Sequence, residues 1–399
     1  MDVDVIIVGA GVVGLAVAAE LAPWAELLLL EREEGYGRGV SSRNSEVVHA
    51  GIYYEPGSLK ARLCLEGRRR IEEWAAQGHF GYRKTGKFIV ATRREELSRL
   101  DDLLEQGRLN GVTSLRRAGV EELAAAEPAV RALAALWSPE TAILDSHGLM
   151  RHLWERARAA GAQLACRSRV AALRPVAGGW ELEVEEGEGA LAPCREEEAP
   201  PVLPRALPRR GPRLTISARA VVNAAGLEAD QVAALAGIDV EGEGLRQYWS
   251  RGEYFTPRGG ACPPLRHLIY PLPPADGEGH LGIHVTLDLG GALRFGPSAT
   301  WPCPPHSRRE DFAQDEALAA DFAAGVSRFL PGLAAADLRP AGVGLRPRRK
   351  PAGDFYIREE GRRGLAGLVN LIGVESPGLT SAPAIARLVG EHLAGVQRV

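Results

Sequence analysis

The stretch DVIIVGAGVVG, at residues 4–14, places a run of strand-forming residues directly before three glycines in the spacing GxGxxG. A second apolar run, LLLL at residues 27–30, ends at the acidic residue Glu31. A buried strand, a glycine turn, a helix, a second strand and a carboxylate thus follow in the order of a dinucleotide-binding βαβ unit. The acid lies about 20 residues after the turn, so we predict that Glu31 hydrogen-bonds the ribose hydroxyls of an adenosine.

Each glycine of this turn has its own predicted task. Gly9 permits the tight turn, Gly11 lets backbone N–H groups approach a pyrophosphate, and Gly14 lets the helix pack close to the strand. The helix N-terminus adds positive partial charge and free N–H donors. Val13, in the first turn of that helix, and Arg32, beside the acid, are further candidate cofactor contacts. An ordinary βαβ packing turn without a ligand is the alternative.

Composition limits the class of protein. The chain has 399 residues, of which 45% are apolar and 25% are charged, and its formal net charge is −3. This length predicts two or three domains, and the composition is ordinary for a soluble globular protein. The small net charge gives no reason to expect nucleic acid as a partner.

Cysteine usage and hydropathy indicate the compartment. The five cysteines are odd in number and lack CxxC spacing, so we expect neither a disulfide framework nor a metal site. No apolar run is long enough to cross a bilayer, and the first residues enter a predicted core strand without a signal sequence. We therefore expect a cytoplasmic protein without a transmembrane segment, and peripheral contact with the inner face of a membrane stays open.

A second glycine-rich segment, GVESPGLTS at residues 373–381, follows the predicted strand 368–372 and precedes a helix predicted over 382–393. A nicotinamide cofactor does not need this second strand–loop–helix, whereas a flavin does, because its ring lies far from the adenine. A helix N-terminus aimed at the ring stabilises the negative charge of reduced flavin. The pattern favours FAD over NAD, with a capped helix lacking a ligand as the alternative. The candidate contacts here are Gly373, Pro377, Gly378, Leu379 and Thr380.

The order of the predicted elements indicates an interrupted architecture. Strand and helix signals alternate near the N-terminus and return at the C-terminus, whereas strands and turns dominate the middle. We expect an α/β protein, α+β overall, with a discontinuous Rossmann-like FAD-binding domain and a substrate domain built on a mixed or antiparallel sheet. The charged, proline-rich segment 185–213 is predicted to be an exposed excursion. The predicted bounds are 1–80, 146–235 and 340–399 for the FAD-binding domain, and 81–145 and 236–339 for the substrate domain.

Several longer motifs lie along nearly the whole chain: SRNSEVVHAGIYY (42–54), GSLKARLC (57–64), TGKFIVA (85–91), RGEYF (251–255), LIYP (268–271) and LIGVESPGLTSA (371–382). With these motifs the chain resembles the superfamily of FAD-dependent D-amino-acid oxidases and glycerol-3-phosphate dehydrogenases. Within that superfamily it is similar to the L-2-hydroxyglutarate dehydrogenase/oxidase family. The glycine fingerprint alone identifies only the superfamily.

The resemblance implies non-covalently bound FAD and the oxidation of L-2-hydroxyglutarate to 2-oxoglutarate. It implies that the loop 41–51 passes the pyrophosphate and reaches the flavin ring, with His49 near the ring. Hydrogen bonds to the cofactor are implied for Ser42, Asn44 and Ser45. The other cofactor contacts that we expect are Val170, Ala225 and Gly226.

The chemistry requires hydride transfer from C2 to flavin N5 and a base for the hydroxyl proton. A neutral histidine suits the base, since its ordinary pKa lies near working pH. His284, on the predicted apolar strand 281–285, is the leading candidate by the resemblance, because this strand would form a wall of the substrate pocket. His49 is the other candidate. A histidine on an apolar strand is otherwise more often a hydrogen-bonded core residue, and that alternative stays open.

The substrate carboxylate next to C2 needs a cation, and arginine binds a carboxylate bidentately. Arg346 is the candidate by resemblance to the active-site arginine of the superfamily, whereas the run 348–350 that follows is predicted to be a solvated basic face. A second cation for the 5-carboxylate is required, and the sequence does not identify it. The candidate hydrogen-bond donors to either carboxylate are Tyr53, Tyr254 and Tyr270.

Two other classes of function share this fold. One is a flavin-dependent amine oxidase that acts on an amino acid, and the other is an FAD-binding partner subunit without turnover. The hydroxyglutarate-type motifs weigh against the first, and the intact glycine turn together with the two histidines weighs against the second. A quinone or oxygen is expected as the final electron acceptor.

Overall fold

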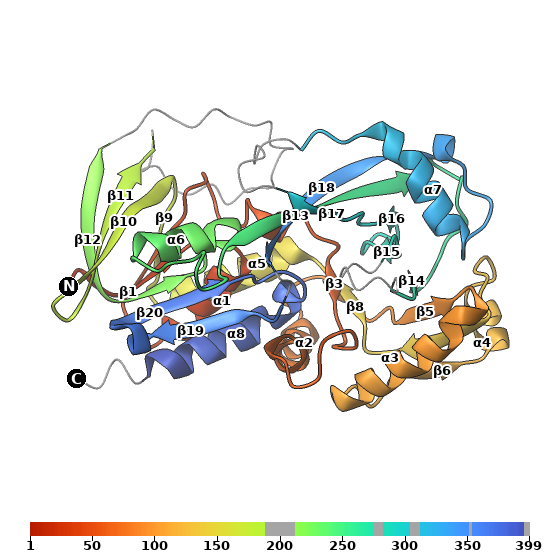
Figure 1. The fold of residues 1–399 in the computed structure, drawn as a ribbon, viewed down its shortest axis with the longest axis horizontal. Helices are drawn as coiled ribbons and strands as arrows, with labels where there is room; N and C mark the ends of the chain where they lie inside the picture. Colours follow the sequence, from red (N-terminus) through yellow and green to blue (C-terminus); the bar gives the residue numbers. More distant parts are fainter. Residues whose placement is uncertain (188–211, 274–281, 304–311, 351–352, 395–399) are drawn as a thin grey trace.

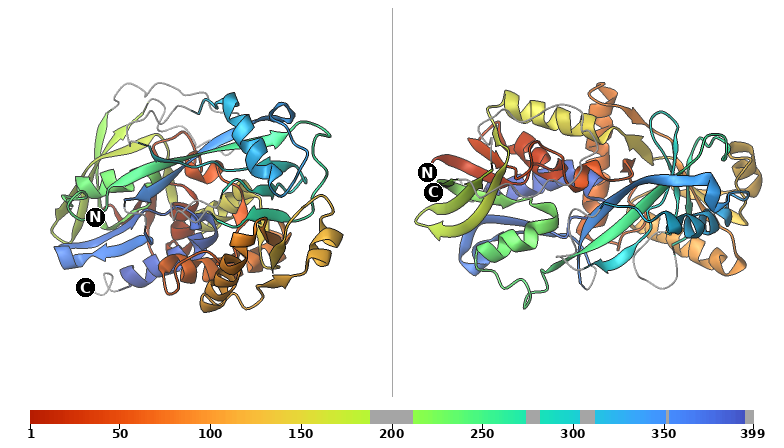
Figure 2. Two further views of the ribbon diagram at one scale, coloured as in Figure 1. Left: turned by 45° about the vertical axis from the view of Figure 1, so that its right-hand side comes forward. Right: turned by 90° about the horizontal axis from the view of Figure 1, so that it is seen from above.

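The structure is a computed structural model that describes residues 1–187, 212–273, 282–303, 312–350 and 353–394. An eight-stranded sheet and a nine-stranded sheet lie in opposite halves of the molecule, with helices packed around them (Figure 1). The N-terminus lies in the half that contains the eight-stranded sheet (Figure 1). The long strands β13 and β18 extend from this half into the other (Figure 2).

The eight-stranded sheet is assembled from segments that are far apart in the sequence. Its strand order is β10-β11-β12-β1-β2-β9, with β20 beside β12 and β19 beside β20. The strands β9, β2, β1, β12 and β20 are mutually parallel, as in a nucleotide-binding sheet. The bounds are β1 (Val3–Val8), β2 (Leu27–Leu30), β9 (Gln163–Ala165), β10 (Ser168–Val176), β11 (Gly179–Glu186), β12 (Arg213–Asn223), β19 (Tyr356–Glu360) and β20 (Leu365–Ile372).

Both faces of this sheet are covered, because its central strands are apolar on both sides. Ile7 packs into the core formed with α1, α5 and α8, whereas its neighbour Ile6 packs into the core on the other face, with α6 and the hairpin β10–β11. Side chains that alternate along one strand thus pack into the cores on opposite faces of the sheet. The helices of this half are α1 (Val12–Leu21), α2 (Leu59–Ala76), α5 (Ser146–Ala159), α6 (Ala229–Leu235) and α8 (Gly378–Leu393).

The nine-stranded sheet is mixed, since β5 and β14 are parallel and its other pairs are antiparallel. Its order is β17-β13-β16-β15-β14-β5-β7-β6, with β18 paired to β13. The bounds are β5 (Lys87–Ala91), β6 (Arg116–Ala118), β7 (Ala134–Ser138), β13 (Gln247–Pro257), β14 (Leu268–Pro271), β15 (Val285–Leu287), β16 (Leu293–Phe295), β17 (Thr300–Cys303) and β18 (Leu338–Arg349).

The helices α3 (Leu97–Leu109), α4 (Val120–Ala126) and α7 (Ala319–Ser327) accompany this second sheet. A small sheet of β3 (Val47–Val48), β4 (Tyr82–Arg83) and β8 (Ala142–Leu144) lies near the junction of the two halves (Figure 1). Single 3₁₀ turns occur at η1 (Val40–Ser42), η2 (Arg94–Glu96), η3 (Gly226–Glu228), η4 (Glu316–Leu318), η5 (Ala335–Asp337) and η6 (Gly361–Arg363).

The fold agrees with the predicted α/β class and corrects two details. Most of the predicted excursion 185–213 lies outside the described residues, but its two ends are strands, because β11 continues to Glu186 and β12 begins at Arg213. Cys166 is disulfide-bonded, which the cysteine count and spacing did not predict. Among the described helices, none combines the length and the apolar character that a bilayer crossing requires.

Candidate active site

The glycine turn after β1 is closed by tight backbone contacts. Gly9 has a φ of +101°, and a Cβ there would lie 2.5 Å from a carbonyl oxygen of the loop after β12. A Cβ on Gly14 would overlap the Gly9 carbonyl oxygen. Gly11 precedes α1 as its N-cap residue, and Ser41 Oγ accepts a hydrogen bond from the Val12 N–H at 2.9 Å. The turn therefore carries a helix N-terminus of the kind that binds phosphate groups.

Glu31 is buried directly after β2, and its carboxylate accepts hydrogen bonds from backbone N–H groups of the neighbouring loops. Oε2 accepts a hydrogen bond from the Ala10 N–H at 2.8 Å, and Oε1 accepts one from the Glu33 N–H at 2.9 Å. Burial raises the pKa of Glu31, and the two hydrogen bonds oppose that effect. Arg32, the next residue, forms an ion pair with Glu228. Glu31 thus shapes the glycine turn, and its contact with a ribose stays a prediction.

The loop 41–46 is held by its own side chains. Asn44 donates a hydrogen bond to a carbonyl oxygen of the loop at 2.7 Å and accepts one from the Glu46 N–H at 2.7 Å. Ser42 donates to a carbonyl oxygen three residues earlier at 3.1 Å. These bonds set the course of the loop beside α1. Cofactor contacts of Ser42, Asn44 and Ser45 stay predictions.

Gln247, which the sequence did not single out, connects two of the predicted cofactor segments. Its Nε2 donates to the Gly226 carbonyl oxygen at 2.9 Å, and its Oε1 accepts from the Gly373 N–H at 2.6 Å. Ala225 lies in the same loop after β12, whereas Val170 is buried on β10 in the core below it. One glutamine at the start of β13 therefore holds both loops beside the second sheet.

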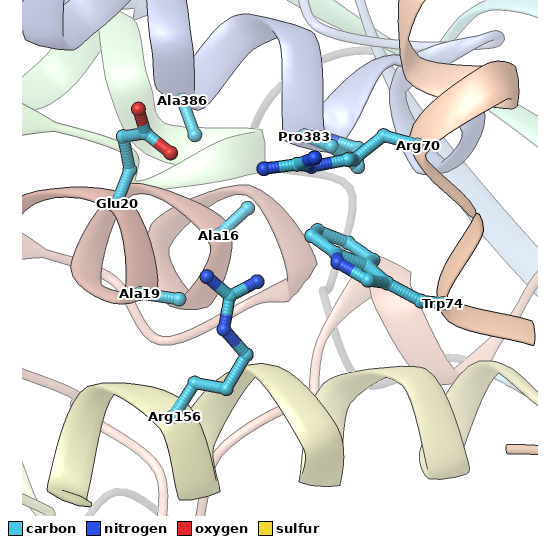
Figure 3. A pocket seen from close by; sticks show the side chains of 8 residues that line it. All are labelled: Ala16, Ala19, Glu20, Arg70, Trp74, Arg156, Pro383 and Ala386. Atoms are coloured by element: carbon cyan, nitrogen blue, oxygen red, sulfur yellow. The ribbon is translucent and has the colours of Figure 1, made fainter. Parts of the chain in front are cut away.

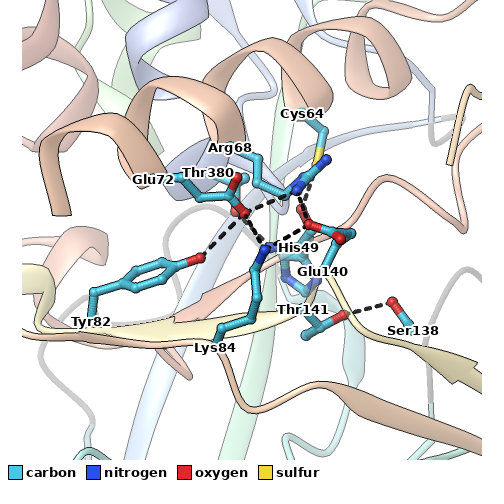
Figure 4. Close-up of polar contacts among 10 residues, drawn as sticks. All are labelled: His49, Cys64, Arg68, Glu72, Tyr82, Lys84, Ser138, Glu140, Thr141 and Thr380. Atoms are coloured by element: carbon cyan, nitrogen blue, oxygen red, sulfur yellow. Dashed lines mark hydrogen bonds and ion pairs between the residues drawn. The ribbon is translucent and has the colours of Figure 1, made fainter. Parts of the chain in front are cut away.

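His49 lies against the beginning of α8. Its N–H donates to Thr380 Oγ1 at 3.0 Å, and its carbonyl oxygen accepts a hydrogen bond from the Cys64 thiol at 3.3 Å (Figure 4). The backbone of the loop is thereby attached to both α2 and α8. The N-cap and first turn of α8, whose N–H groups are free of intrahelical partners, contain the predicted contacts Pro377, Gly378, Leu379 and Thr380.

The ring of His49 is less firmly held than its backbone. Nε2 lies 3.3 Å from Ser376 Oγ, and Nδ1 is buried without a hydrogen-bond partner in the described structure. Burial, with smaller contributions from the charges of Lys87 and Arg346, lowers the pKa of His49 to about 3. His49 is therefore neutral at working pH, with one nitrogen left for a ligand.

Replacing Gly14 by alanine is expected to reduce both stability and cofactor content. The added methyl group meets the backbone of Gly9, so the strand–helix contact must open at a cost of about 1–3 kcal/mol or more. Melting temperature and the FAD released per protein on denaturation measure the two effects. Gly119→Ala is the matched control, since a Cβ at that position meets nothing within 4 Å. Wild-type FAD content in Gly14→Ala would contradict this function of the turn.

The second sheet presents two chemically different faces. Phe255, Phe295, Val285, Ile269 and Phe88 lie in one transverse row on neighbouring strands and pack into an apolar core with α7. Because side chains alternate along a strand, their neighbours lie on the opposite face. On the strands, that face carries Tyr254, Tyr270, Arg294, Lys87 and, through its pairing with Ser250, Arg346. His284 joins them, because its ring stacks on that of Tyr270. Four of the predicted catalytic and substrate-binding residues therefore share one surface.

His284 lies directly before β15 and is not part of a strand, which corrects the prediction of a strand over 281–285. The neighbouring pair Ile269–Val285 places it opposite Tyr270, and the two rings stack with centroids 3.8 Å apart. Nδ1 lies 3.0 Å from the Gly282 carbonyl oxygen. A carbonyl can only accept, so Nδ1 carries the proton and Nε2 keeps its lone pair. Burial lowers the pKa of His284 to about 3, with smaller contributions from Arg346 and Lys87.

The three predicted tyrosines surround the same centre. The hydroxyls of Tyr53 and Tyr270 are buried and have no hydrogen-bond partner within the described ranges. Burial raises the pKa of both, so both are neutral donors. Tyr254 is buried on β13 and contributes to the raised pKa of Tyr270. Two orphaned hydroxyls in a buried site indicate that a ligand supplies their acceptor.

Arg346 and the basic run after it have different environments from those expected. Arg346 is half-buried on β18, acts electrostatically on Tyr270 and His284, and has no carboxylate partner in the part of the chain that the structure describes. Arg348 was predicted to be solvated, but it is buried and forms an ion pair with Glu375 at 3.3 Å. Lys350, at the end of the run, is exposed as predicted. The buried Arg348 needs the anion that Glu375 supplies.

Two further cations on this face were missed by sequence reasoning. Lys87 is 1% exposed at the start of β5, and its Nζ lies 4.5 Å from the ring centres of Tyr53 and Tyr270. Arg294 lies on β16, donates to the Asn44 carbonyl oxygen at 3.1 Å, and has its guanidinium 5.6 Å from the Tyr254 ring centre. The sequence could have indicated Lys87, because it is the one charged residue in the otherwise apolar strand KFIVA (87–91).

Other polar features lie outside this centre. Arg68 on α2 pairs with Glu72 at 2.9 Å and with Glu140 at 2.8 Å, and Lys84 pairs with Glu140 at 2.9 Å, which ties α2 to the β7–β8 turn (Figure 4). A shallow pocket between α1, α2, α5 and α8 has two arginine side chains on either side of Trp74 (Figure 3). None of the predicted site residues lines this pocket, so its contacts serve helix packing.

Together, the glycine turn, the helix N-terminus beside His49 and the polar sheet face define a flavin-dependent oxidoreductase, and the comparisons with known proteins agree. Residues 4–392 match the DAO family, described as FAD dependent oxidoreductase. The chain is 37% identical to an L-2-hydroxyglutarate dehydrogenase, mitochondrial, of Arabidopsis thaliana, across 98% of this chain and 83% of that protein. It is 28% identical to a protein of the same name from Caenorhabditis elegans, across 97% of this chain and 92% of that one.

Among solved structures, the chain is similar to the L-alpha-glycerophosphate oxidase from Mycoplasma pneumoniae with FAD bound. The TM-score is 0.80 at 24% identity, across 98% of this chain and 94% of that one. This likeness supports the Rossmann-like FAD-binding fold. The chain therefore belongs to the DAO family of FAD-dependent oxidoreductases, in the group of the L-2-hydroxyglutarate dehydrogenases, and its cofactor is FAD.

Proposed function

We propose that this protein oxidises L-2-hydroxyglutarate to 2-oxoglutarate. The main support for this proposal is the excess of positive charge on the polar face of the second sheet. Lys87, Arg294 and Arg346 lie on this face, and none of them has a carboxylate partner among the described residues. Such a site is complementary to a substrate with two negative charges. The names of the related dehydrogenases supply the particular dicarboxylate.

Arg346 is proposed to bind the carboxylate next to the hydroxyl carbon. Its guanidinium can donate two parallel hydrogen bonds to that carboxylate, which fixes the orientation of the neighbouring carbon. Tyr270 and Tyr53, whose hydroxyls have no hydrogen-bond partner among the described residues, are proposed to donate to substrate oxygens.

His284 is proposed to take the hydroxyl proton. When bound, FAD accepts the hydride from C2 at N5. Proton removal requires an unprotonated nitrogen that keeps its position, and the Gly282 carbonyl oxygen fixes the His284 tautomer that has Nε2 free. Carboxylates bound at Arg346 and Lys87 oppose the two charges that lower the pKa of His284, so binding of the substrate strengthens the base.

The cofactor is proposed to be held without a covalent bond by residues 1–80, 146–235 and 340–399. Its pyrophosphate would lie at the glycine turn and the N-terminus of α1, and its ring would lie between His49 and the beginning of α8. Residues 81–145 and 236–339 would supply the substrate wall. The electrons are proposed to pass on to a quinone or to oxygen.

The purified protein is expected to contain FAD and to lose its visible flavin absorbance when L-2-hydroxyglutarate is added without oxygen. Because the proposed site orders both carboxylates around one face of the substrate carbon, the D-enantiomer should leave the absorbance unchanged. Bleaching and the appearance of 2-oxoglutarate are followed together. Readmitting oxygen, or adding a soluble quinone, then identifies the acceptor. Faster bleaching by glycine, a D-amino acid or glycerol 3-phosphate would overturn the proposed substrate.

A further inference from the structure

Lys87 is a buried cation for which the described part of the chain supplies no anion. Its side chain is enclosed by the rings of Tyr53 and Tyr270, and no described carboxylate forms an ion pair with it. Lysine is almost never fully buried without a partner, because removal of an unpaired ammonium from water is costly. The two cation–π contacts offset only part of that cost. The buried, unpaired ammonium therefore indicates that an anionic ligand binds beside Lys87.

Lys87 and Arg346 lie on opposite sides of the row that contains His284 and Tyr270. Lys87 is aligned with the residue two positions before Tyr270 on β14, which is about 7 Å along the strand. Arg346 lies on the other side, where β13 and β18 approach the first sheet. Both charges act on His49 as well as on His284. The two cations therefore flank the centre where the substrate carbon would meet its base.

We propose that Lys87 binds the distal carboxylate of the substrate, while Arg346 binds the carboxylate beside the oxidised carbon. The inference rests on the proposed function, because it assigns one end of the same dicarboxylate. A five-carbon dicarboxylate has a charge at each end, so it can bridge two cations across the His284–Tyr270 pair. The ammonium of Lys87 then gains the anion that the described protein lacks. Lys87 would thus select a dicarboxylate over a monocarboxylate.

Arg294 is the competing candidate on the same face. It is half-buried, and part of its donor capacity is used on the Asn44 carbonyl oxygen, which joins β16 to the loop 41–46. Lys87 lies against the ring of Tyr270, which stacks on His284, whereas Arg294 lies against the ring of Tyr254. We therefore assign the distal carboxylate to Lys87, and Arg294→Met is the competing variant that tests this assignment.

The experiment compares the binding of glutarate and butyrate to the oxidised FAD-containing protein at pH 6, measured by perturbation of the flavin spectrum. Lys87→Met should weaken glutarate binding by about 30-fold or more, the usual effect of removing one partner of a buried charge pair. Butyrate binding should change less than about threefold. Lys87→Arg should keep most of the preference for glutarate. FAD content and melting temperature establish that each variant is folded, which is expected because methionine suits a buried site.

The dependence of binding on pH separates a charge from a packing effect. Burial lowers the pKa of Lys87 to about 7, so its charge is present below that pH and lost above it. Glutarate should therefore bind more weakly as the pH rises through about 7, and this dependence should vanish in Lys87→Arg. The other titratable groups around Lys87 are neutral throughout, since the histidines have lowered pKa values and Cys64, Tyr53 and Tyr270 have raised ones. Arg346 stays charged.

The outcomes are distinguishable from a failure of the proposed function, because glutarate binding involves no turnover. Loss of the glutarate preference in Arg294→Met, with Lys87→Met unaffected, would overturn the assignment to Lys87. Equal binding of glutarate and butyrate by the wild-type protein would overturn it as well. If glutarate binds through Lys87 but L-2-hydroxyglutarate does not bleach the flavin, the reaction is wrong and the dicarboxylate site remains.

Discussion

Replacing His284 by alanine is expected to slow flavin reduction by L-2-hydroxyglutarate by about 10²–10⁴-fold, the usual contribution of a general base. The Gly282 carbonyl oxygen fixes the tautomer with a free Nε2, and stacking on Tyr270 fixes the plane of the ring. Alanine removes the proton acceptor but leaves the substrate cations in place, so the rate should fall far more than the apparent affinity. Anaerobic stopped-flow measurement of flavin absorbance gives both quantities.

Two other histidines complete this test. His79→Ala is the control, because His79 stacks on His152 away from the sheet face and should leave reduction unchanged. His49→Ala is the parallel measurement, since the ring of His49 lies near the same cations. Normal reduction in His284→Ala with a slow His49→Ala would transfer the base to His49. Normal reduction in both variants would exclude proton removal by histidine.

The pH dependence of flavin reduction should differ from that expected for a histidine with an ordinary pKa. Burial holds the pKa of His284 at about 3, so the base is already neutral at pH 5 and protonates only in stronger acid. The value of kcat/KM for flavin reduction, which reports the ionisations of the free enzyme, should therefore show no loss between pH 7 and pH 5. A steep loss centred near pH 6.5 would contradict a buried, neutral base.

Replacing Arg346 by methionine is expected to reduce kcat/KM for flavin reduction by about 10²–10³-fold. A carboxylate bound in a buried site loses its charged, bidentate partner, which costs about 2–5 kcal/mol. The guanidinium has no carboxylate partner within the described residues, so its removal leaves no protein anion unpaired. The fold should therefore survive, and the loss should appear in substrate binding and orientation.

Arg346→Lys tests geometry against charge. Lysine keeps the positive charge but not the planar fork, so it should recover only part of the loss. Arg348→Lys is a contrasting variant, since Arg348 pairs with Glu375 and its replacement should act on stability. Full activity in Arg346→Lys would mean that charge alone suffices. Full activity in Arg346→Met would remove this residue from the substrate site.

Local sequence patterns predicted the cofactor half of the protein well. The glycine turn, the two strands beside it and the terminal strand–helix depend on short-range constraints, such as the absence of a Cβ at Gly9 and Gly14 and the continuous apolar runs of β1 and β2. These constraints are visible in eleven residues and recur at fixed spacing. They lead directly to the parallel sheet that the structure contains.

The substrate side was predicted less completely, because its residues meet only through long-range strand pairing. Arg348 was expected in solvent, yet its side chain is buried and forms an ion pair with Glu375. Lys87 was part of a recognised motif, but nothing in that motif reveals that two tyrosines enclose it. Burial and the absence of a partner are properties of the fold, not of the residue type.

By itself the sequence determined the class of the protein, its FAD-binding unit and most of the residues with suitable chemistry, since residue types and their spacing are written in the chain. Only the tertiary structure decided how those residues combine. The registers of β14, β15, β16 and β5 bring Tyr270, His284, Arg294 and Lys87 onto one face. Burial on that face makes the histidines neutral and lowers the pKa of Lys87, and the described residues supply no carboxylate partner to the cations there. Hydrophobic packing on the opposite face sets those registers, and so it positions the chemistry.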